Sequence, residues 1–412
     1  MAANIPNDNI TLPASWRGRA PVFVAVGAIA VLLSLGIFYF TNTEKAELGF
    51  RTFFHSYLAN FIYCLSFCLG ALFFVMVSHL ARAGWSASIR RIAELYAYTI
   101  PWWALLFLPI LAMVLFTPSD ALYAWNGNVD NLTHVVQEKL VYLNPIFFSL
   151  RTAVYFAVFI IAASVYFKMS RKQDDTGDTE ITLKLQRWAG PFIMLFALAL
   201  NFASFDWMMS TDAGWFSTMY GVYLFAASML SFFAVMIVTC YLLQRNGRIE
   251  SLVTTEHYHD MSKFQFGFIV FWAYIAFSQF MLYWYGNIPE ETLWYKYRMN
   301  NNWQWLGLAL IVFHFAIPFL GTVSRHVRRN RGVMAGWAGL LLVAHWLDMT
   351  FLIMPNVSEN TPMSVPLLFG HLICWIGMVS LFIALFLWRV GDTPVVAVKD
   401  PWLPDALAYH NV

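Results

Sequence analysis

Ten long apolar runs constrain this chain more than any other feature of its sequence. A helix needs about 20 mostly apolar residues to cross a hydrocarbon core, and only helices and closed barrels satisfy their backbone hydrogen bonds there. Uninterrupted runs favour helices over the alternating strands of a barrel. The sequence therefore predicts an all-α integral membrane protein with ten transmembrane helices, at approximately residues 21–40, 52–80, 95–116, 145–168, 188–210, 215–243, 263–285, 303–323, 333–354 and 364–388.

Composition agrees with a chain that lies in a membrane. Hydrophobic residues make up 60% of the 412 residues and charged residues 12%, whereas soluble domains carry about 25% charged residues. No connection between the runs is long enough for a separate soluble domain, so residues 1–412 are expected to form a single polytopic membrane domain. The net charge is +2 without a clustered basic face, so no nucleic-acid partner is expected.

The basic residues predict the orientation. Nineteen of the 25 Lys and Arg residues lie before the first run or in connections on the same side, and six lie on the other side. Basic residues accumulate on the cytoplasmic side, so both termini are expected to be cytoplasmic, in agreement with an even number of spans. The proline-containing tail, residues 391–412, is expected to be extended, in a form that could lie along another subunit.

Ionisable side chains inside the runs are the candidate functional residues. Each costs about 2.5–3.5 kcal/mol or more at the bilayer centre, so such groups normally face the bundle interior. Asp206 lies in the outer part of run 188–210. His345 and Asp348 are three residues apart and share one face of run 333–354. The other candidates are His314, His371 and Arg151 within runs, and His79 and Glu94 near the cytoplasmic side.

Histidine and carboxylate side chains can pass protons along a hydrogen-bonded chain. The sequence suggests an outer relay of Asp206, His345 and Asp348, a central step at His314, and a cytoplasmic entrance at Glu94 and His79. For each residue alone, a structural interhelical hydrogen bond is the alternative interpretation. Asp206 and Asp348 both stand beside aromatic residues and lie four runs apart. This spacing hints at two four-helix units, spans two to five and six to nine, flanked by spans one and ten.

Three other classes compete with a proton-transfer subunit. Prolines in or beside the runs favour kinked helices, which secondary transporters use near the bilayer midplane. A purely structural membrane scaffold is a further alternative. Haem would require a cross-helix pair such as His314 with His345, because no run carries the paired histidines of two-haem cytochrome b bundles. The four cysteines lie in runs and form no CxxC pair, so no metal site is expected.

Two segments carry a resemblance to a known family. Ser204–Ser210 (SFDWMMS) and Trp215–Tyr223 (WFSTMYGVY) are similar to segments of the NrfD/PsrC-like membrane subunits of alternative complex III, and to the ActF-type members in particular. The resemblance covers nearly the whole chain, including His345–Asp348 (HWLD). It implies two four-helix bundles with flanking helices. Asp206 then matches the family's buried acid of span five, and Asp348 matches more loosely the acid of span nine.

The resemblance also implies partners and an activity. It implies a bacterial cytoplasmic-membrane complex that oxidises menaquinol or ubiquinol and passes the electrons to a soluble carrier or an oxidase. The implied partners are an ActC-like membrane subunit, an iron–sulfur subunit and multihaem c-type cytochrome subunits, with lipids around the spans. Haem and iron–sulfur clusters would lie on those partners and not on this chain, which would contribute assembly and proton translocation. Quinone binding would involve His55, Tyr57 and Asp206.

Overall fold

The protein is described by a computed structural model that covers residues 10–41, 46–117, 119–358 and 361–410. The chain is 80% helical, and no strand occurs within these residues. Ten helical segments among them are long and apolar enough to cross a membrane. The predicted all-α, multi-pass membrane fold is confirmed.

The spans follow the predicted runs in number and order. They are α2 (Ala20–Thr41), α3 (Ala46–Leu80), a broken span of α4 (Ala87–Ala97), α5 (Ile100–Leu106) and α6 (Leu108–Phe116), α8 (Pro145–Thr176), α9 (Glu180–Trp207), α10 (Tyr220–Arg245), α11 (Thr255–Gly286), a broken span of α13 (Trp303–Leu310), η6 (Ile311–Ala316) and α14 (Ile317–Thr322), α16 (Arg331–Ile353) and α17 (Val365–Val390).

Short helices cover the ends of these spans. They are α1 (Ala14–Arg17), η2 (Gly84–Ser86), η3 (Ala124–Asn126), η4 (Val129–Asn131), α7 (His134–Lys139), η5 (Met209–Asp212), α12 (Pro289–Arg298), α15 (Arg325–Arg328), η7 (Met354–Val357) and α18 (Leu403–Leu407).

The start of the sixth span differs from the prediction. The apolar run begins at 215, but α10 begins at Tyr220. Trp215 does not enter the span, because its ring stacks on Trp294 of α12 with centroids 4.5 Å apart. An apolar run predicts that its residues are buried but not what buries them. Here the first residues of the run lie outside the span, where Trp215 is covered by α12. Several other helices extend beyond their runs, as α11 does, since helix geometry continues past the hydrocarbon.

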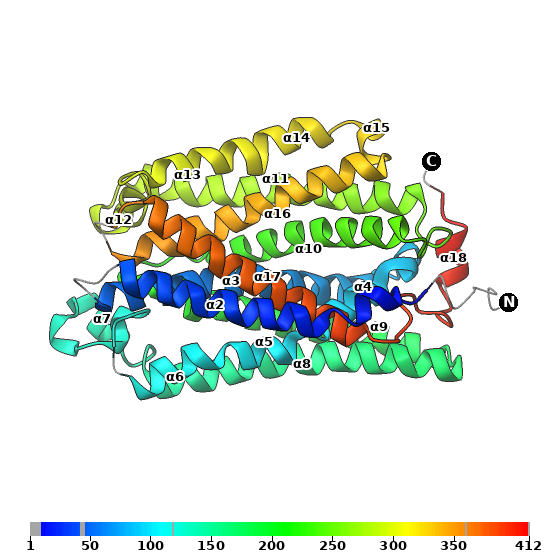
Figure 1. Ribbon diagram of the computed structural model, residues 1–412, viewed down its shortest axis with the longest axis horizontal. Helices are drawn as coiled ribbons and strands as arrows, with labels where there is room; N and C mark the ends of the chain where they lie inside the picture. Colours follow the sequence, from blue (N-terminus) through cyan, green and yellow to red (C-terminus); the bar gives the residue numbers. More distant parts are fainter. Residues whose placement is uncertain (1–9, 42–45, 118, 359–360, 411–412) are drawn as a thin grey trace.

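Both ends of the described chain lie at the same end of the elongated bundle (Figure 1). We call this end, with α4 and α18, the terminal face, and the opposite end, with α7 and α12, the distal face. Two termini at one end agree with an even number of crossings.

The spans pack as two four-helix bundles with a flanking pair. Helices α3, α4–α6, α8 and α9 form the first bundle, and α10, α11, α13–α14 and α16 form the second. The central helices α3 and α10 pack against each other, and α2 pairs with α17 along the side of the bundles (Figure 1). The predicted grouping of the spans is therefore confirmed.

Glycines set the closest helix contacts. A Cβ on Gly70 of α3 would lie 2.4 Å from the carbonyl oxygen of Ser228 on α10, so only glycine permits this approach. Between the flanking helices, a Cβ on Gly27 would lie 3.0 Å from the carbonyl oxygen of Gly377. Small residues at such contacts are typical of membrane helices, because close packing replaces the hydrophobic driving force.

The C-terminal tail folds back over the terminal face of its own chain. The amide of Val395 donates to the carbonyl of Ile10 at 2.7 Å, and the hydroxyl of Tyr409 donates to Asp260 of α11 at 2.6 Å. The expectation of an extended tail is wrong for residues 391–410, whereas contact of the tail with another subunit stays a prediction. The prolines of the tail suggested an extended conformation. Composition does not show that residues such as Ile10 and Asp260 hydrogen-bond to the tail.

Candidate proton-transfer site

The structure places the predicted residues in separate groups. These are Asp348 with His345 and His314 in the second bundle, Asp206 with Arg151 at the distal end of the first bundle, Glu94 with His79 near the terminal face, and His371 on α17, while His55 and Tyr57 lie on α3. The predicted relay is thus divided between two bundles.

Asp348 is wholly buried between three helices of the second bundle. Its Oδ1 accepts a hydrogen bond from the Tyr223 hydroxyl of α10 at 2.5 Å, and its Oδ2 accepts from Trp272 Nε1 of α11 at 3.0 Å. No Lys or Arg forms an ion pair with it within the described part of the chain. Asp348 is therefore an intramembrane acid held by neutral donors, an environment in which a proton can be gained without breaking a salt bridge.

Two histidines lie close to Asp348, on the far side of Trp272. The Trp272 ring lies against His314, with centroids 4.0 Å apart, and the His314 and His345 rings are 6.5 Å apart. Nε2 of His345 bonds to the Ser66 hydroxyl of α3 at 2.8 Å. Both ring nitrogens of His314 and Nδ1 of His345 are buried without a hydrogen-bond partner among the described residues. Each such atom costs about 1–3 kcal/mol, so the cluster is unusual for a purely structural core.

The backbone around His314 is also irregular. Residues Ile311–Ala316 form a π-helical turn, which in membrane and soluble proteins is frequent at functional sites. Pro318 follows, and it has no N–H to donate to the carbonyl of His314 four residues earlier. The break thus lies at the residue whose side chain enters the cluster.

Asp206 has a different environment, although its burial is also complete. Arg151 of α8 donates Nε to Oδ2 at 2.7 Å and Nη2 to Oδ1 at 3.0 Å, and the Tyr155 hydroxyl donates to Oδ2 at 2.7 Å. The guanidinium also lies over the rings of Tyr142 and Phe147 at 3.7 and 4.4 Å. Such a bidentate pair couples α8 to α9. The structure therefore brings Arg151 and Asp206 together but keeps them apart from Asp348, with α10 between α9 and α16.

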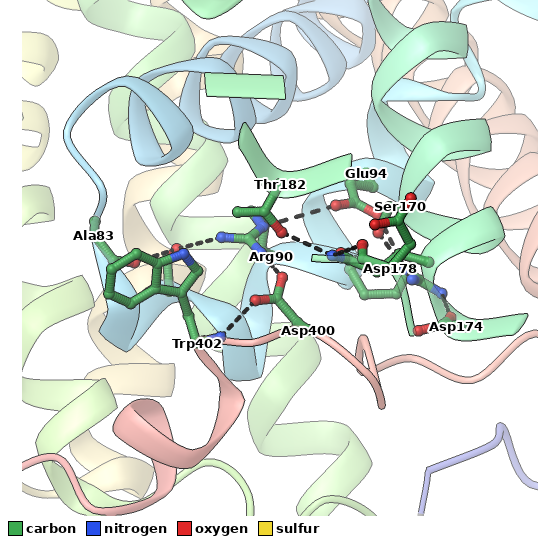
Figure 2. Close-up of polar contacts among 12 residues, drawn as sticks. Ala83, Arg90, Glu94, Ser170, Asp174, Asp178, Thr182, Asp400 and Trp402 are labelled. Atoms are coloured by element: carbon green, nitrogen blue, oxygen red, sulfur yellow. Dashed lines mark hydrogen bonds and ion pairs between the residues drawn. The ribbon is translucent and has the colours of Figure 1, made fainter. Parts of the chain in front are cut away.

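Glu94 belongs to a buried charge cluster near the terminal face, shown in Figure 2. Its Oε2 accepts from Nε of Arg91 at 2.9 Å, and Arg91 also pairs with Asp174 at 2.7 Å. Arg90 lies between Glu94, at 3.8 Å, and Asp400 of the tail, with which it forms an ion pair. Acids and arginines alternate and form ion pairs here, so the cluster fastens α4, α8 and the tail together.

His79 lies on α3 close to this cluster. Its ring is 5.3 Å from that of Tyr166, and its Nε2 has no hydrogen-bond partner among the described residues. Glu94 and His79 are both in the first bundle, whereas His314 is in the second. No described hydrogen bond joins the expected entrance to the expected central step.

The remaining predicted residues have structural partners. The two ring nitrogens of His371 bond to the hydroxyls of Ser56 and Thr350, each at 2.8 Å, and tie α17 to α3 and α16. This pattern matches the alternative interpretation of an interhelical hydrogen bond. The Tyr57 hydroxyl donates to the carbonyl of Leu106 at 2.6 Å, where span three is broken. His55 bonds through Nδ1 to the carbonyl of Arg51 at 2.8 Å, while its buried Nε2 is without a partner in the described chain.

At the distal face, Arg298 closes the end of the second bundle. Its guanidinium donates to the carbonyls of Phe351 and Leu352 at 2.9 and 2.7 Å and lies 3.2 Å over the Trp294 ring. Burial lowers the pKa of Arg298 to about 9. A cation on the last carbonyls of α16 offsets the negative end of the helix dipole.

Sequence reasoning missed the partners that define the central cluster. Tyr223 lies in a segment that carries the family resemblance, so a signal for it existed. No sequence signal singled out Trp272 or Ser66, because aromatic and hydroxyl residues are common in these spans.

The haem alternative fits the cluster poorly. Ser66 already bonds Nε2 of His345, and Trp272 lies against His314, so a porphyrin between the two rings would displace both contacts. Within the described residues, the four cysteines are free and buried, and no group of three or more potential ligands is placed to hold a metal ion. No protein-family model and no curated protein matches the chain.

Proposed function

We propose that this chain is a membrane subunit of a quinol-oxidising electron-transfer complex of the alternative complex III type. Its part in that complex is assembly and proton translocation. The observation that carries the proposal is the central cluster. Among the described residues, Asp348 is buried without a cation, and both ring nitrogens of His314 and Nδ1 of His345 have no hydrogen-bond partner. Intramembrane ionisable groups face the bundle interior and typically mark ion pathways or proton relays.

Quinol oxidation releases two electrons and two protons. In the proposal, the electrons leave through an iron–sulfur subunit and multihaem c-type cytochrome subunits, and an ActC-like subunit is the membrane neighbour. A proton that reaches Asp348 converts its carboxylate to an acid and weakens the bonds from Tyr223 and Trp272. His314 and His345 each offer a nitrogen that accepts a proton on one side and a second nitrogen that releases it on the other. The terminal face is then the cytoplasmic side of a bacterial cytoplasmic membrane.

The other predicted residues take supporting roles in this proposal. Asp206 with Arg151 forms an outer site, Glu94 and His79 remain the cytoplasmic entrance to the first bundle, and His371 holds α17 in place. A menaquinone or ubiquinone head group would find a free hydrogen-bonding atom at Nε2 of His55. Tyr57 could join only by leaving the carbonyl of Leu106, so the fit of this residue pair is partial.

Replacing Asp348 with Asn in the intact complex tests the proposal. Asn keeps the size of the side chain and its acceptor oxygen but cannot carry the proton. We expect assembled complex with slower quinol oxidation or fewer protons released per quinol, because both depend on the acid. Thr350→Val, on the same helix, is the control, since its partner His371 retains the bond to Ser56. Unchanged turnover and unchanged proton release in Asp348→Asn would contradict the proposal.

A secondary transporter is the second candidate, and one observation favours it. The π-helical turn and Pro318 break span eight beside a buried polar cluster, as transporters break helices at substrate sites. Substrate-dependent uptake by the purified chain alone in liposomes would support this candidate. A scaffold would instead tolerate Asp348→Asn, while deletion of the chain would release the partner subunits.

A further inference from the structure

A cluster of cations at the terminal face has no part in the proposed function. Helix α15, which carries Arg325 and Arg328, packs against α11, α14 and α16 at the terminal end of the second bundle (Figure 1). Both arginines and Lys263 of α11 lie close enough to His259 of α11 for their charges to act on it. Lys263 is paired with Asp260 at 3.0 Å. Three cations from two helices therefore converge here, beside one acid.

Two of these cations have no acid partner. Within the described part of the chain, neither Arg325 nor Arg328 forms an ion pair, whereas the neighbouring Arg329 pairs with Glu256 of α11. The same short helix thus uses one arginine to attach itself to α11 and presents two others. A site with two uncompensated guanidinium groups favours an anion.

The side chain of Arg328 is held in place although no acid binds it. Its guanidinium lies over the Phe266 ring of α11, 5.1 Å from the ring centroid, and Nη2 donates to the carbonyl of Val323 at 2.5 Å. Nη1 forms no hydrogen bond within the described chain. A basic residue that serves only to set membrane orientation can keep its head group in water. Arg328 is instead fixed against the protein with a donor still available.

An exposed apolar surface continues from the cation cluster toward the membrane. Val323, Leu320 and Ile317 follow along α14 and its end, and they are 50%, 70% and 38% exposed. Helix α14 lies at the outer edge of the bundle (Figure 1). An acyl chain can pack along this surface while its head group stays beside α15. A basic site above an apolar surface suits an amphipathic anion better than a soluble one.

We propose that Arg325 and Arg328, together with the exposed side of α14, bind the phosphate and one acyl chain of an anionic phospholipid. Guanidinium groups suit phosphate, because their planar donors form two parallel hydrogen bonds to it. Basic pockets between membrane helices on the cytoplasmic side bind anionic lipid head groups in this way. The lipid site is independent of the proposed function, because it requires only that this edge of the second bundle meets lipid.

Lipid binding to the purified full-length protein tests the proposal. Protein depleted of lipid in a mild detergent is titrated with phosphatidylglycerol, phosphatidylcholine or inorganic phosphate, and native mass spectrometry counts the bound molecules. Arg325→Gln with Arg328→Gln should weaken the tightest phosphatidylglycerol site about thirtyfold, since each basic residue near a membrane surface contributes about fivefold. Lys184→Gln with Arg187→Gln is the matched control, because it removes the same charge from exposed positions of α9 and should leave the affinity unchanged.

Three results of this titration would overturn the proposal. They are equal affinity of the natural protein for phosphatidylglycerol and phosphatidylcholine, equal phosphatidylglycerol affinity of the double-arginine variant and the natural protein, and displacement of phosphatidylglycerol by an equal concentration of inorganic phosphate. The last result would assign the cations to a soluble anion in place of a lipid.

Photo-crosslinking of the natural protein in its own membranes locates the lipid and does not depend on the folding of a variant. Phosphatidylglycerol with a diazirine in its acyl chain should label residues 317–323. Phosphatidylcholine with the same chain should label them at least about fivefold less, because its head group has no net charge for the arginines to bind. Equal labelling by the two lipids, or no labelling of this segment, would contradict the proposal.

Discussion

Replacing Asp400 with Asn should release the C-terminal tail from the terminal face. The side chains of Asp400 and Arg90 are each 2% exposed, and they form an ion pair that joins the tail to α4 (Figure 2). Removing one partner of a buried pair costs about 3–5 kcal/mol, because the other charge stays buried. Glu94 lies 3.8 Å from Nε of Arg90 and retains part of the compensation. The lower limit, about 3 kcal/mol, is therefore expected, which shifts the tail equilibrium about a hundredfold toward release.

Limited proteolysis of membrane vesicles with the terminal face exposed measures this shift. Tail cleavage should be much faster in Asp400→Asn than in the natural protein. Lys399→Ala is the matched control: among the described residues its Nζ donates to the carbonyl of Asp175 at an exposed position, so a loss of less than about 1 kcal/mol is expected. An apolar replacement of both Arg90 and Asp400 should restore most of the protection, since no charge is left unpaired. Cleavage of Asp400→Asn within about twofold of the natural rate would refute this reasoning.

Two other perturbations have outcomes that the packing predicts. Gly70→Ala should destabilise the protein by about 1–3 kcal/mol in thermal unfolding in detergent, because its Cβ would strike the carbonyl of Ser228; Gly36→Ala, with open space at its Cβ, should not. Burial and the hydrogen bond to Asp260 raise the pKa of Tyr409 from 10.0 to about 12. The docking contribution of Tyr409 is thus present below pH 10 and lost as the pH rises through about 12. Tail proteolysis measured against pH should show this step, and Tyr409→Phe should lack it.

Much of the fold could be predicted from the sequence, because the hydrocarbon core requires runs of a known length. The runs located all ten spans and, through the repeated Asp206 and Asp348, suggested their grouping into two bundles. Span ends were less predictable. Trp215 is apolar and extends a run, yet it packs under α12, and hydropathy alone does not separate these two kinds of burial.

The sequence predicted the individual residues of the candidate site but not which of them contact one another. Asp206 and Asp348 occupy similar positions in the sequence, yet one is bound by an arginine of a neighbouring span and the other by Tyr223 and Trp272. The pair of Arg90 and Asp400 joins residues 310 positions apart, and no local pattern predicts that distance. Such partners depend on which helix faces meet, and that is decided by packing throughout the bundle.

Partner retention tests the central claim most directly. The tagged full-length chain is extracted from its own membranes with a mild detergent, and every retained protein is identified and quantified by mass spectrometry. The proposed function predicts an iron–sulfur subunit, multihaem c-type cytochrome subunits and a second large membrane subunit, all in a fixed ratio to this chain. Recovery of the chain as a monomer or homo-oligomer, active in transport by itself, would contradict the account.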